Sequence, residues 1–330
     1  MTAAVPPPPP PIDGAALATR GLRKSYGHRL ALDGLDLTVP RGLVYGFLGP
    51  NGAGKTTTMR LLVGLIRPDA GSIELLGQPY TAHDRRRLYR VGALIEAPAF
   101  YPFLNGRENL RALAASGQSV KPGRIEELIE LVGLRDRAGD KVGNYSMGMK
   151  QRLGIAAALL GDPELLLLDE PANGLDPAGI VGMRETLRAL AAGGKTVFVS
   201  SHILPEVQQL ADVVGIIARG RLVREGPVAQ LLDEGRVRVR VTWEEGPDAT
   251  RLLEAAFGAE AVARRTESDG SWLEVQVPAS RAAEVNRELA KASVFASRVE
   301  AGSDLESLFL ELTGERVTAD DGSTGIGGVA

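Results

Sequence analysis

Residues 47–58 read FLGPNGAGKTTT and determine the fold that the rest of the chain must accommodate. Four of these residues satisfy the spacing G-x-x-x-x-G-K-[ST], namely Gly49, Gly54, Lys55 and Thr56. The run 43–48 before them is apolar and typical of a buried strand, and leucines at 61, 62 and 65 follow at helical spacing. The sequence therefore predicts a glycine-rich loop that connects a buried strand to a helix beginning near Lys55.

Such a loop is an anion-binding site. Unpaired backbone N–H groups at the helix start point into it, and the helix dipole adds partial positive charge worth roughly 0.3–1 kcal/mol per anionic charge. Lys55 adds a full charge for the outer phosphates of a nucleotide, and the Thr56 hydroxyl is placed as a ligand for Mg²⁺. A glycine-rich turn before an ordinary helix is the alternative, but four specified positions in this context argue against it. We expect nucleotide contacts along the whole loop, from Gly49, Pro50, Asn51, Gly52, Ala53, Gly54, Lys55, Thr56 and Thr57.

Composition restricts the class of protein. The 330 residues include 38 basic and 41 acidic side chains, so the net charge of −3 provides no broad attraction for nucleic acid or anionic lipid. Cysteine is absent, which excludes disulfides and thiolate metal sites and favours a reducing compartment. Apolar runs stop far short of about 18 residues, and the start lacks the pattern of a signal peptide. We expect a cytoplasmic protein.

The pattern along the chain predicts two domains. A proline run at 6–11 belongs to an expected disordered head at 1–15. Alternating strands, a buried run at 165–168 and later strand-after-helix repeats predict an α/β domain at 16–235, with a mainly parallel sheet, antiparallel strands before the loop and a helical insertion at about 97–160.

The pattern changes beyond Gly235. Valines at 237, 239 and 241 alternate with polar residues, and an Asp269-Gly270 turn predicts a hairpin. The expected order is βαββαβ, a ferredoxin-like α+β domain at 236–314, whose last helix begins with a Ser303/Glu306 capping box. A polar, glycine-rich tail at 315–330 is expected to be disordered.

Two acids follow the buried run LLLLDEP at the sheet edge where the glycine loop also lies. Mg²⁺ requires an oxygen ligand that stays ionised, which suits Asp169. Hydrolysis requires a group that polarises a water molecule, which suits Glu170. A pair of surface acids is the alternative for this motif alone, and the glycine loop at the same sheet edge argues against it.

Five motifs in order resemble the ATP-binding subunit of ABC transporters. They are GPNGAGKTT, YSMGMKQR, LLLLDEP, GLDP at 174–177 and SSH at 200–202. The resemblance extends from about Ala16 to Leu232 and implies an α/β P-loop NTPase of the ABC type. It also implies an ATPase that closes as a dimer, here expected to be a homodimer, on two Mg-ATP. A separate transmembrane permease subunit is the implied partner, which places the chain at the inner face of the cell membrane.

The resemblance also assigns single residues. Tyr26 falls where the family stacks an aromatic ring on adenine, although a lone Tyr in a turn is more often a packing residue. Ser146 and Gly148 fall where the family's signature contacts the γ-phosphate bound by a second subunit. Asp176 lies in the loop that communicates across that dimer. His202 falls where the family has a histidine near the γ-phosphate and the attacking water, so the expected catalytic residues are Lys55, Glu170 and His202.

Two positions depart from the family pattern. Glu96 replaces the usual glutamine after the strand at 91–95, and the usual leucine-serine-glycine-glycine-glutamine signature reads YSMGM at 145–149. We expect Glu96 to join Thr56 and Asp169 as a metal ligand. The segment IEAPAFYP together with YSMGMKQR resembles the branch that serves drug, antibiotic or lantibiotic export and self-immunity.

Three functions remain open from the sequence. An ATPase subunit that drives a membrane partner is favoured. A soluble ABC-type ATPase acting on ribosomes, DNA or cofactor assembly is the alternative, and the unduplicated cassette without a basic patch or coiled-coil insertion argues against it. A regulatory, ligand-sensing role of the C-terminal domain is the third, and that domain could dimerise, bind a ligand or brace the membrane subunit.

Overall fold

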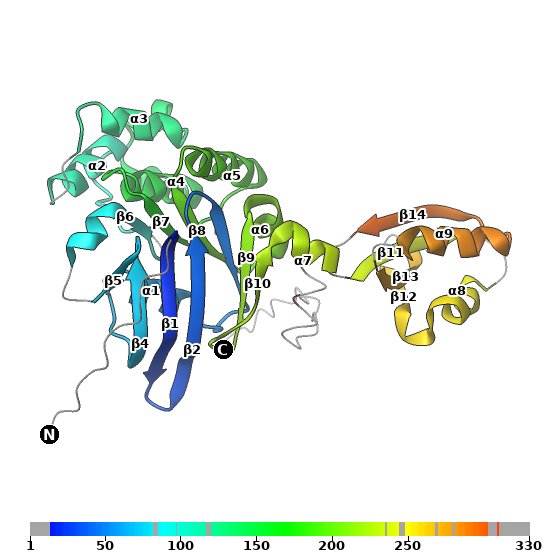
Figure 1. The fold of residues 1–330 in the computed structure, drawn as a ribbon. Coiled ribbons are helices and arrows are strands. Elements are labelled where there is room, and N and C mark those ends of the chain that lie inside the picture. Colours follow the sequence, from blue (N-terminus) through cyan, green and yellow to red (C-terminus); the bar gives the residue numbers. More distant parts are fainter. Residues whose placement is uncertain are drawn as a thin grey trace, which may run out of the picture. The chain divides into compact units, whose positions relative to one another are not determined.

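The computed structural model describes residues 14–81, 85–96, 98–116, 120–234, 236–243, 248–267, 270–278, 281–302 and 309. The chain divides into two compact units, Met1–Ala229 and Gln230–Ala330 (Figure 1). The expected disordered head and tail lie almost wholly outside the described residues, and so does the Ser303/Glu306 capping box.

The first unit contains an antiparallel sheet of four strands in the order β2-β1-β4-β5. Its strands are β1 (Ala15–Tyr26), β2 (Arg29–Pro40), β4 (Ala70–Leu75) and β5 (Gln78–Tyr80). The β1–β2 pair forms a long hairpin whose register ends with Tyr26 opposite Arg29. Because β1 continues to Tyr26, the aromatic side chain is held by a strand rather than by the loose turn that the sequence suggested.

A second sheet has six strands in the order β10-β9-β3-β8-β7-β6. The last five strands in this order, from β9 to β6, are parallel to one another, and the edge strand β10 is antiparallel to β9. The strands are β3 (Val44–Leu48), β6 (Val91–Leu94), β7 (Leu165–Asp169), β8 (Thr196–Ser201), β9 (Val213–Ala218) and β10 (Arg221–Pro227). Every residue of β3, β7 and β8 is buried, as expected for central parallel strands covered on both faces.

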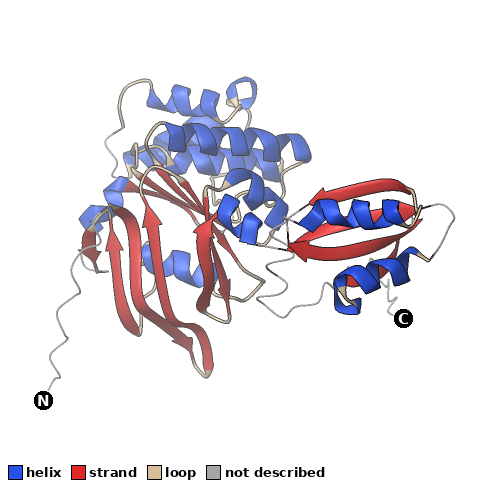
Figure 2. Cartoon of the chain, turned by 45° about the vertical axis from the view of Figure 1, so that its right-hand side comes forward, coloured by secondary structure: helices blue, strands red, loops and turns tan. Residues whose placement is uncertain are grey.

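Helix α1 (Lys55–Leu62) lies between the two sheets (Figure 2). Its Met59, Leu61 and Leu62 belong to one core with residues of β1, β2, β3 and β7. Phe198 of β8 stacks on Tyr45 and Phe47 of β3 with ring centroids 5.4 and 5.3 Å apart. This packing fixes β3 and α1, the two elements that flank the glycine loop.

The helical insertion contains α2 (Gly106–Ala115), α3 (Arg124–Leu131) and α4 (Met147–Ala158). Asn105 and Glu108 form a capping box at the start of α2. The first unit also contains α5 (Pro177–Ala192) and α6 (Leu204–Leu210), and α7 (Val228–Glu234) includes the boundary between the two units. No helix in the described part of the chain is long and apolar enough to cross a membrane.

The second unit has the element order β11 (Arg236–Trp243), α8 (Ala249–Phe257), β12 (Val262–Glu267), β13 (Gly270–Pro278), α9 (Ala282–Lys291) and β14 (Ala296–Gly302). All strand pairs are antiparallel, in the order β12-β13-β11-β14. Leu253 of α8 and Leu289 of α9 share a core with Val239, Val275 and Val277. Both helices therefore cover the same face of the sheet, which is the expected ferredoxin-like arrangement.

Candidate nucleotide-binding site

The glycine loop leaves the carboxyl end of β3 and closes against the neighbouring strand ends. A Cβ at Gly49 would lie 2.5 Å from the carbonyl oxygen of Ile217. Gly54 has φ of 115°, and a Cβ there would lie 2.8 Å from the carbonyl oxygen of Ala31. Both positions therefore require glycine, for space at Gly49 and for space and backbone conformation at Gly54. The loop ends at Lys55, where α1 begins.

Lys55 is folded back into this loop. Its side chain is 6% exposed, and Nζ donates hydrogen bonds to the carbonyl oxygens of Gly49 at 2.5 Å and Pro50 at 3.3 Å. The same Nζ lies 3.4 Å from Oε1 of Glu170. A buried ammonium requires such partners, and phosphate oxygens are acceptors that can replace them.

Asp169 forms the other side of the site at the end of β7. Thr56 Oγ1 donates to Asp169 Oδ2 at 2.8 Å, and Ser200 Oγ donates to Oδ1 at 2.5 Å. Asp169 is only 4% exposed, so these two hydroxyls compensate for its burial. Among the described residues, no three His, Cys, Asp or Glu side chains are arranged so that they could hold a metal ion together. One carboxylate beside one hydroxyl fits Mg²⁺, which usually takes one or two protein ligands and completes its shell with phosphate and water.

Glu170 occupies a backbone conformation that is rare for a residue with a side chain, with φ of 48°. Its backbone N–H donates to the carbonyl oxygen of Ser200 at 3.2 Å and to the Ser200 hydroxyl at 3.1 Å. Its Oε2 lies 2.8 Å from Nδ1 of His202. Strain of this kind is characteristic of functional sites, and here it directs the carboxylate between Lys55 and His202.

A nearby acid responds to these charges. Glu206 lies on α6, one turn beyond His202. Burial raises the pKa of its carboxyl group, His202 lowers it, and the negative charge of Glu170 raises it further. The electrostatic field of the Glu170–His202 pair therefore reaches α6.

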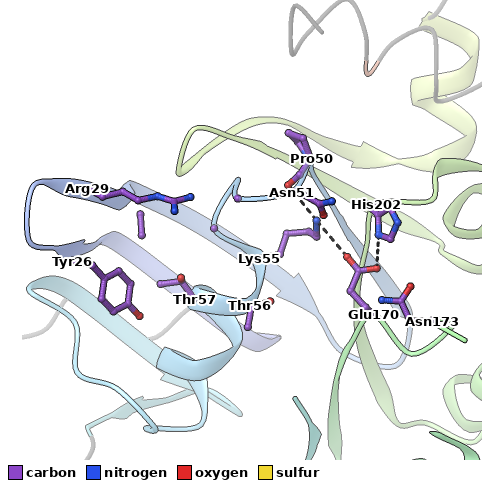
Figure 3. A pocket seen from close by; sticks show the side chains of 13 residues that line it. Tyr26, Arg29, Pro50, Asn51, Lys55, Thr56, Thr57, Glu170, Asn173 and His202 are labelled. Atoms are coloured by element: carbon purple, nitrogen blue, oxygen red, sulfur yellow. Dashed lines mark hydrogen bonds and ion pairs between the residues drawn. The ribbon is translucent and has the colours of Figure 1, made fainter. Parts of the chain in front are cut away.

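Lys55, Thr56, Glu170 and His202 line one pocket of about 480 Å³ (Figure 3). Most of the predicted nucleotide residues are there: Tyr26, Pro50, Asn51, Gly52, Gly54, Lys55, Thr56, Thr57, Glu170 and His202. The predicted site residues Gly49, Ala53 and Asp169 lie outside its lining. Figure 3 shows Tyr26 at one end and Glu170 with His202 at the other, with Lys55 between them. An aromatic surface and an acid–imidazole pair thus flank the phosphate loop at opposite ends.

Three lining residues were not singled out from the sequence, namely Arg29, Ala31 and Asn173. Asn173 donates its backbone N–H to the carbonyl oxygen of Glu170 at 3.1 Å, so a tight turn returns it to the pocket. Arg29 is directed into the pocket by the β1–β2 register. The turn residues Gly27 and His28 were a local signal for this hairpin, but the register that places Arg29 opposite Tyr26 is a long-range property.

Ser146, Gly148 and Asp176 do not line this pocket. Ser146 is the exposed N-cap of α4, and its hydroxyl accepts from the backbone N–H of Met149 at 3.2 Å. Asp176 is the N-cap of α5 and accepts from Gly179 at 3.1 Å. A Cβ at Gly148 would lie 3.0 Å from Leu175, so the start of α4 packs against the loop that precedes α5. Ser146 and Asp176 therefore cap two helices whose starts lie close together, outside the pocket of their own chain.

Glu96 also lies apart from the pocket lining. It follows β6 with φ of 64°, and its carboxylate forms an ion pair with Arg60 of α1. Glu96 and Arg60 are 54% and 38% exposed. The structure therefore shows an alternative partner for the residue that we expected to bind metal.

The sheet pair, the helical insertion and a glycine loop facing a strand-end acid pair define an ATP-binding cassette. Comparison with known proteins agrees. The family described as "ABC transporter" matches residues 32–173. Bacitracin transport ATP-binding protein BcrA of Enterococcus faecalis is 38% identical over 300 residues, which cover 90% of this chain and 96% of that protein.

Further relatives extend this result. Nod factor export ATP-binding protein I of Burkholderia lata is 38% identical over 92% of this chain and 98% of its own length. Lantibiotic transport ATP-binding protein SrtF of Streptococcus pyogenes is 42% identical over 63% of this chain and 90% of its own length. A solved ATP-binding subunit of an ABC transporter superposes with a TM-score of 0.60 at 29% identity, covering 66% of this chain and 91% of that one.

The chain belongs to the ABC transporter ATP-binding family and is an ATPase subunit of a transporter. The bacitracin and lantibiotic transport relatives confirm the expected drug, antibiotic or lantibiotic export branch. The alignment with the Enterococcus faecalis protein covers 300 residues, more than the first unit of 229 contains, so the second unit is shared with that relative.

Proposed function

We propose that two copies of this chain close on two Mg-ATP and drive a separate membrane subunit that exports an antibiotic or a related peptide. The observation that carries the proposal is the convergence of Lys55, Glu170 and His202 in one pocket, beside the hydrogen-bonded Thr56 and Asp169. Each group required for phosphoryl transfer to water is present, and its position is fixed by buried strands.

Each residue of the pocket has a separate role in the proposed hydrolysis of ATP. Lys55 exchanges its carbonyl and carboxylate partners for the outer phosphates. Thr56 and Asp169 would hold Mg²⁺, which neutralises charge on the transferred phosphoryl group when bound. Once Lys55 moves to the phosphates, Glu170 is free to accept a proton from the attacking water. His202 holds the Glu170 carboxylate through Nδ1 and faces the same end of the pocket.

A second copy completes this site. Ser146 at the start of α4 is exposed and does not line the pocket of its own chain. A helix start with an N-cap hydroxyl is suited to bind a γ-phosphate. Two chains arranged about a twofold axis would each offer this surface to the other's nucleotide, which is the isologous geometry of a homodimer.

The loop that precedes α2 offers a surface for the membrane subunit. Tyr101 and Phe103 are 55% and 65% exposed, and their ring centroids lie 5.8 Å apart. The buried Asn109 holds this loop through hydrogen bonds to the backbone of Tyr101, Leu104 and Asn105. Two aromatic rings presented on a rigid loop are typical of a protein interface.

The test uses a membrane subunit encoded beside this chain. Phe103→Asp should lose co-purification with that subunit in detergent and lose stimulation of ATPase activity by it, while basal activity is kept. Tyr89→Asp is the matched control, because Tyr89 is 63% exposed elsewhere on the surface. Capture of ribosomes or DNA instead of a membrane protein would favour the soluble ABC-type ATPase. Export of a candidate peptide from reconstituted vesicles would test the substrate class.

A further inference from the structure

The β1–β2 hairpin places a basic side chain beside the aromatic one at the end of the pocket. Tyr26 and Arg29 are the last register pair of the hairpin, separated by the two-residue turn Gly27–His28. Gly27 has φ of 58°. A two-residue hairpin turn requires a positive φ at this position, which glycine adopts without strain. Residues directly opposite in an antiparallel pair project to the same face of the sheet, with Cβ atoms about 4.5–5.5 Å apart.

Arg29 reaches from this hairpin to the glycine loop. Its Nη2 lies 3.0 Å from the position that a Cβ on Gly52 would occupy. Arg29 also lines the pocket together with Tyr26 and Lys55 (Figure 3). The guanidinium therefore lies between the aromatic end of the pocket and the first half of the phosphate loop.

The charge of Arg29 is not used within the described part of the chain. Lys55 is held by Glu170 and two carbonyls, and the nearby Lys24 pairs with Asp69 at 2.8 Å. The Arg29 side chain has no hydrogen-bond or ion-pair partner among the described residues, whereas its backbone pairs with Tyr26. An exposed arginine without a partner is ordinary on a protein surface, but this one contributes to the wall of an anion-binding pocket.

We infer that Arg29 binds the α- and β-phosphates of the nucleotide from the side opposite to Lys55. This inference rests on the proposed nucleotide site and adds a second cation to it. Lys55 and the Glu170–His202 pair lie toward the far end of the pocket, where the γ-phosphate is processed. Arg29 lies at the near end, beside Tyr26, where the base and the first phosphates would be held. A guanidinium can bind two phosphate oxygens through its planar fork.

Arg29 lies away from the γ-phosphate end of the pocket. The α- and β-phosphates are present in both ATP and ADP, so the contact with Arg29 would have the same strength before and after hydrolysis. Loss of Arg29 is therefore expected to weaken the binding of substrate and product together and to leave the turnover number nearly unchanged. This pattern differs from that of a group acting on the γ-phosphate.

The experiment measures equilibrium binding by the full-length protein, with displacement of a fluorescent ADP by ADP, AMP and adenosine. Arg29→Ala is compared with wild type, with Arg29→Lys and with His28→Ala. His28 is the control because it lies in the same turn, is exposed and does not line the pocket. Circular dichroism establishes that each variant is folded.

We expect Arg29→Ala to weaken ADP and AMP binding about 5- to 30-fold, as for loss of a charged hydrogen bond at a partly exposed position. Adenosine binding and the His28→Ala variant should be unaffected, and Arg29→Lys should recover part of the loss. Unchanged ADP affinity in Arg29→Ala would overturn the inference. An equal loss for adenosine would also overturn it, because Arg29 would then contact the nucleoside. Failure of the wild type to bind ADP at all would instead contradict the proposed function.

Discussion

Glu96 is the position where this chain departs from its family beside the proposed metal site, and the structure predicts how two substitutions there should differ. Glu96 forms an ion pair with Arg60 on α1. Arg60 lies four residues after Thr56 on the same helix, so the two side chains project from one face, a single turn apart. Glu96 can therefore either remain with Arg60 or move about one turn toward the metal ligands.

The ion pair is weak enough for this exchange. Its side chains are 38% and 54% exposed, and exposed pairs contribute about 0.2–1 kcal/mol. Separation of Glu96 from Arg60 therefore weakens Mg²⁺ binding by Glu96 at most about fivefold. Arg60→Gln should lower the Mg²⁺ concentration for half-maximal activity by up to about that factor. Glu96→Gln removes the carboxylate and should raise this concentration by a few fold.

The assay is the initial rate of phosphate release at fixed ATP while free Mg²⁺ is varied. Glu96→Gln should keep most of its basal activity and show its main defect when the membrane subunit is present. Glu170→Gln serves as the reference for loss of the catalytic base. If Glu96→Gln loses basal hydrolysis as completely as that reference, the base has been assigned to the wrong residue. If neither variant at this ion pair shifts the Mg²⁺ dependence, Glu96 is not a metal residue.

Three further predictions follow from the contacts of single residues. Lys55→Ala should abolish phosphate release without unfolding the protein, and near-normal turnover of a variant with a wild-type circular dichroism spectrum would remove the basis of the site. Ser200→Ala removes the hydroxyl that donates to Asp169 at 2.5 Å. It should raise the Mg²⁺ concentration for half-maximal activity and lower the free energy of unfolding by about 1–3 kcal/mol. If both quantities are unchanged, the Ser200 hydroxyl is dispensable. A chain truncated after Glu234 keeps the buried Leu231 of α7 and should still bind ADP, whereas loss of fold on truncation would show that the second unit completes the first.

The elements with strong local signals were predicted from the sequence. Strands β3, β7 and β8 have every residue buried, and the runs at 43–48 and 165–168 are apolar. Helix α1 begins at Lys55 because the glycine loop requires a helix there. β10 was not predicted. It is an edge strand whose residues are mostly exposed, so it carries charged side chains in place of an apolar pattern.

The pocket was predicted less completely than the fold. Residues within one motif, such as Lys55 and Thr56, are placed by their neighbours in the chain. Arg29 is placed by the pairing of two long strands, and Asn173 by the strained backbone at Glu170. The ion pair of Glu96 with Arg60 joins two elements 36 residues apart, which no local pattern indicates. The positions of Arg29, Asn173 and Glu96 therefore depend on strand register and tertiary contacts, which the sequence motifs do not specify.

The proposed composite site is tested most directly by the mass of the Glu170→Gln variant in solution. Removal of the base typically lowers the rate about 100- to 10,000-fold, so ATP should stay uncleaved and hold two chains together. Light scattering should give the single-chain mass of 34.9 kDa without nucleotide and twice that mass with Mg-ATP. Addition of Ser146→Arg to the same variant should block the doubling without loss of ATP binding. A variant that binds Mg-ATP yet stays at the single-chain mass would contradict the shared site.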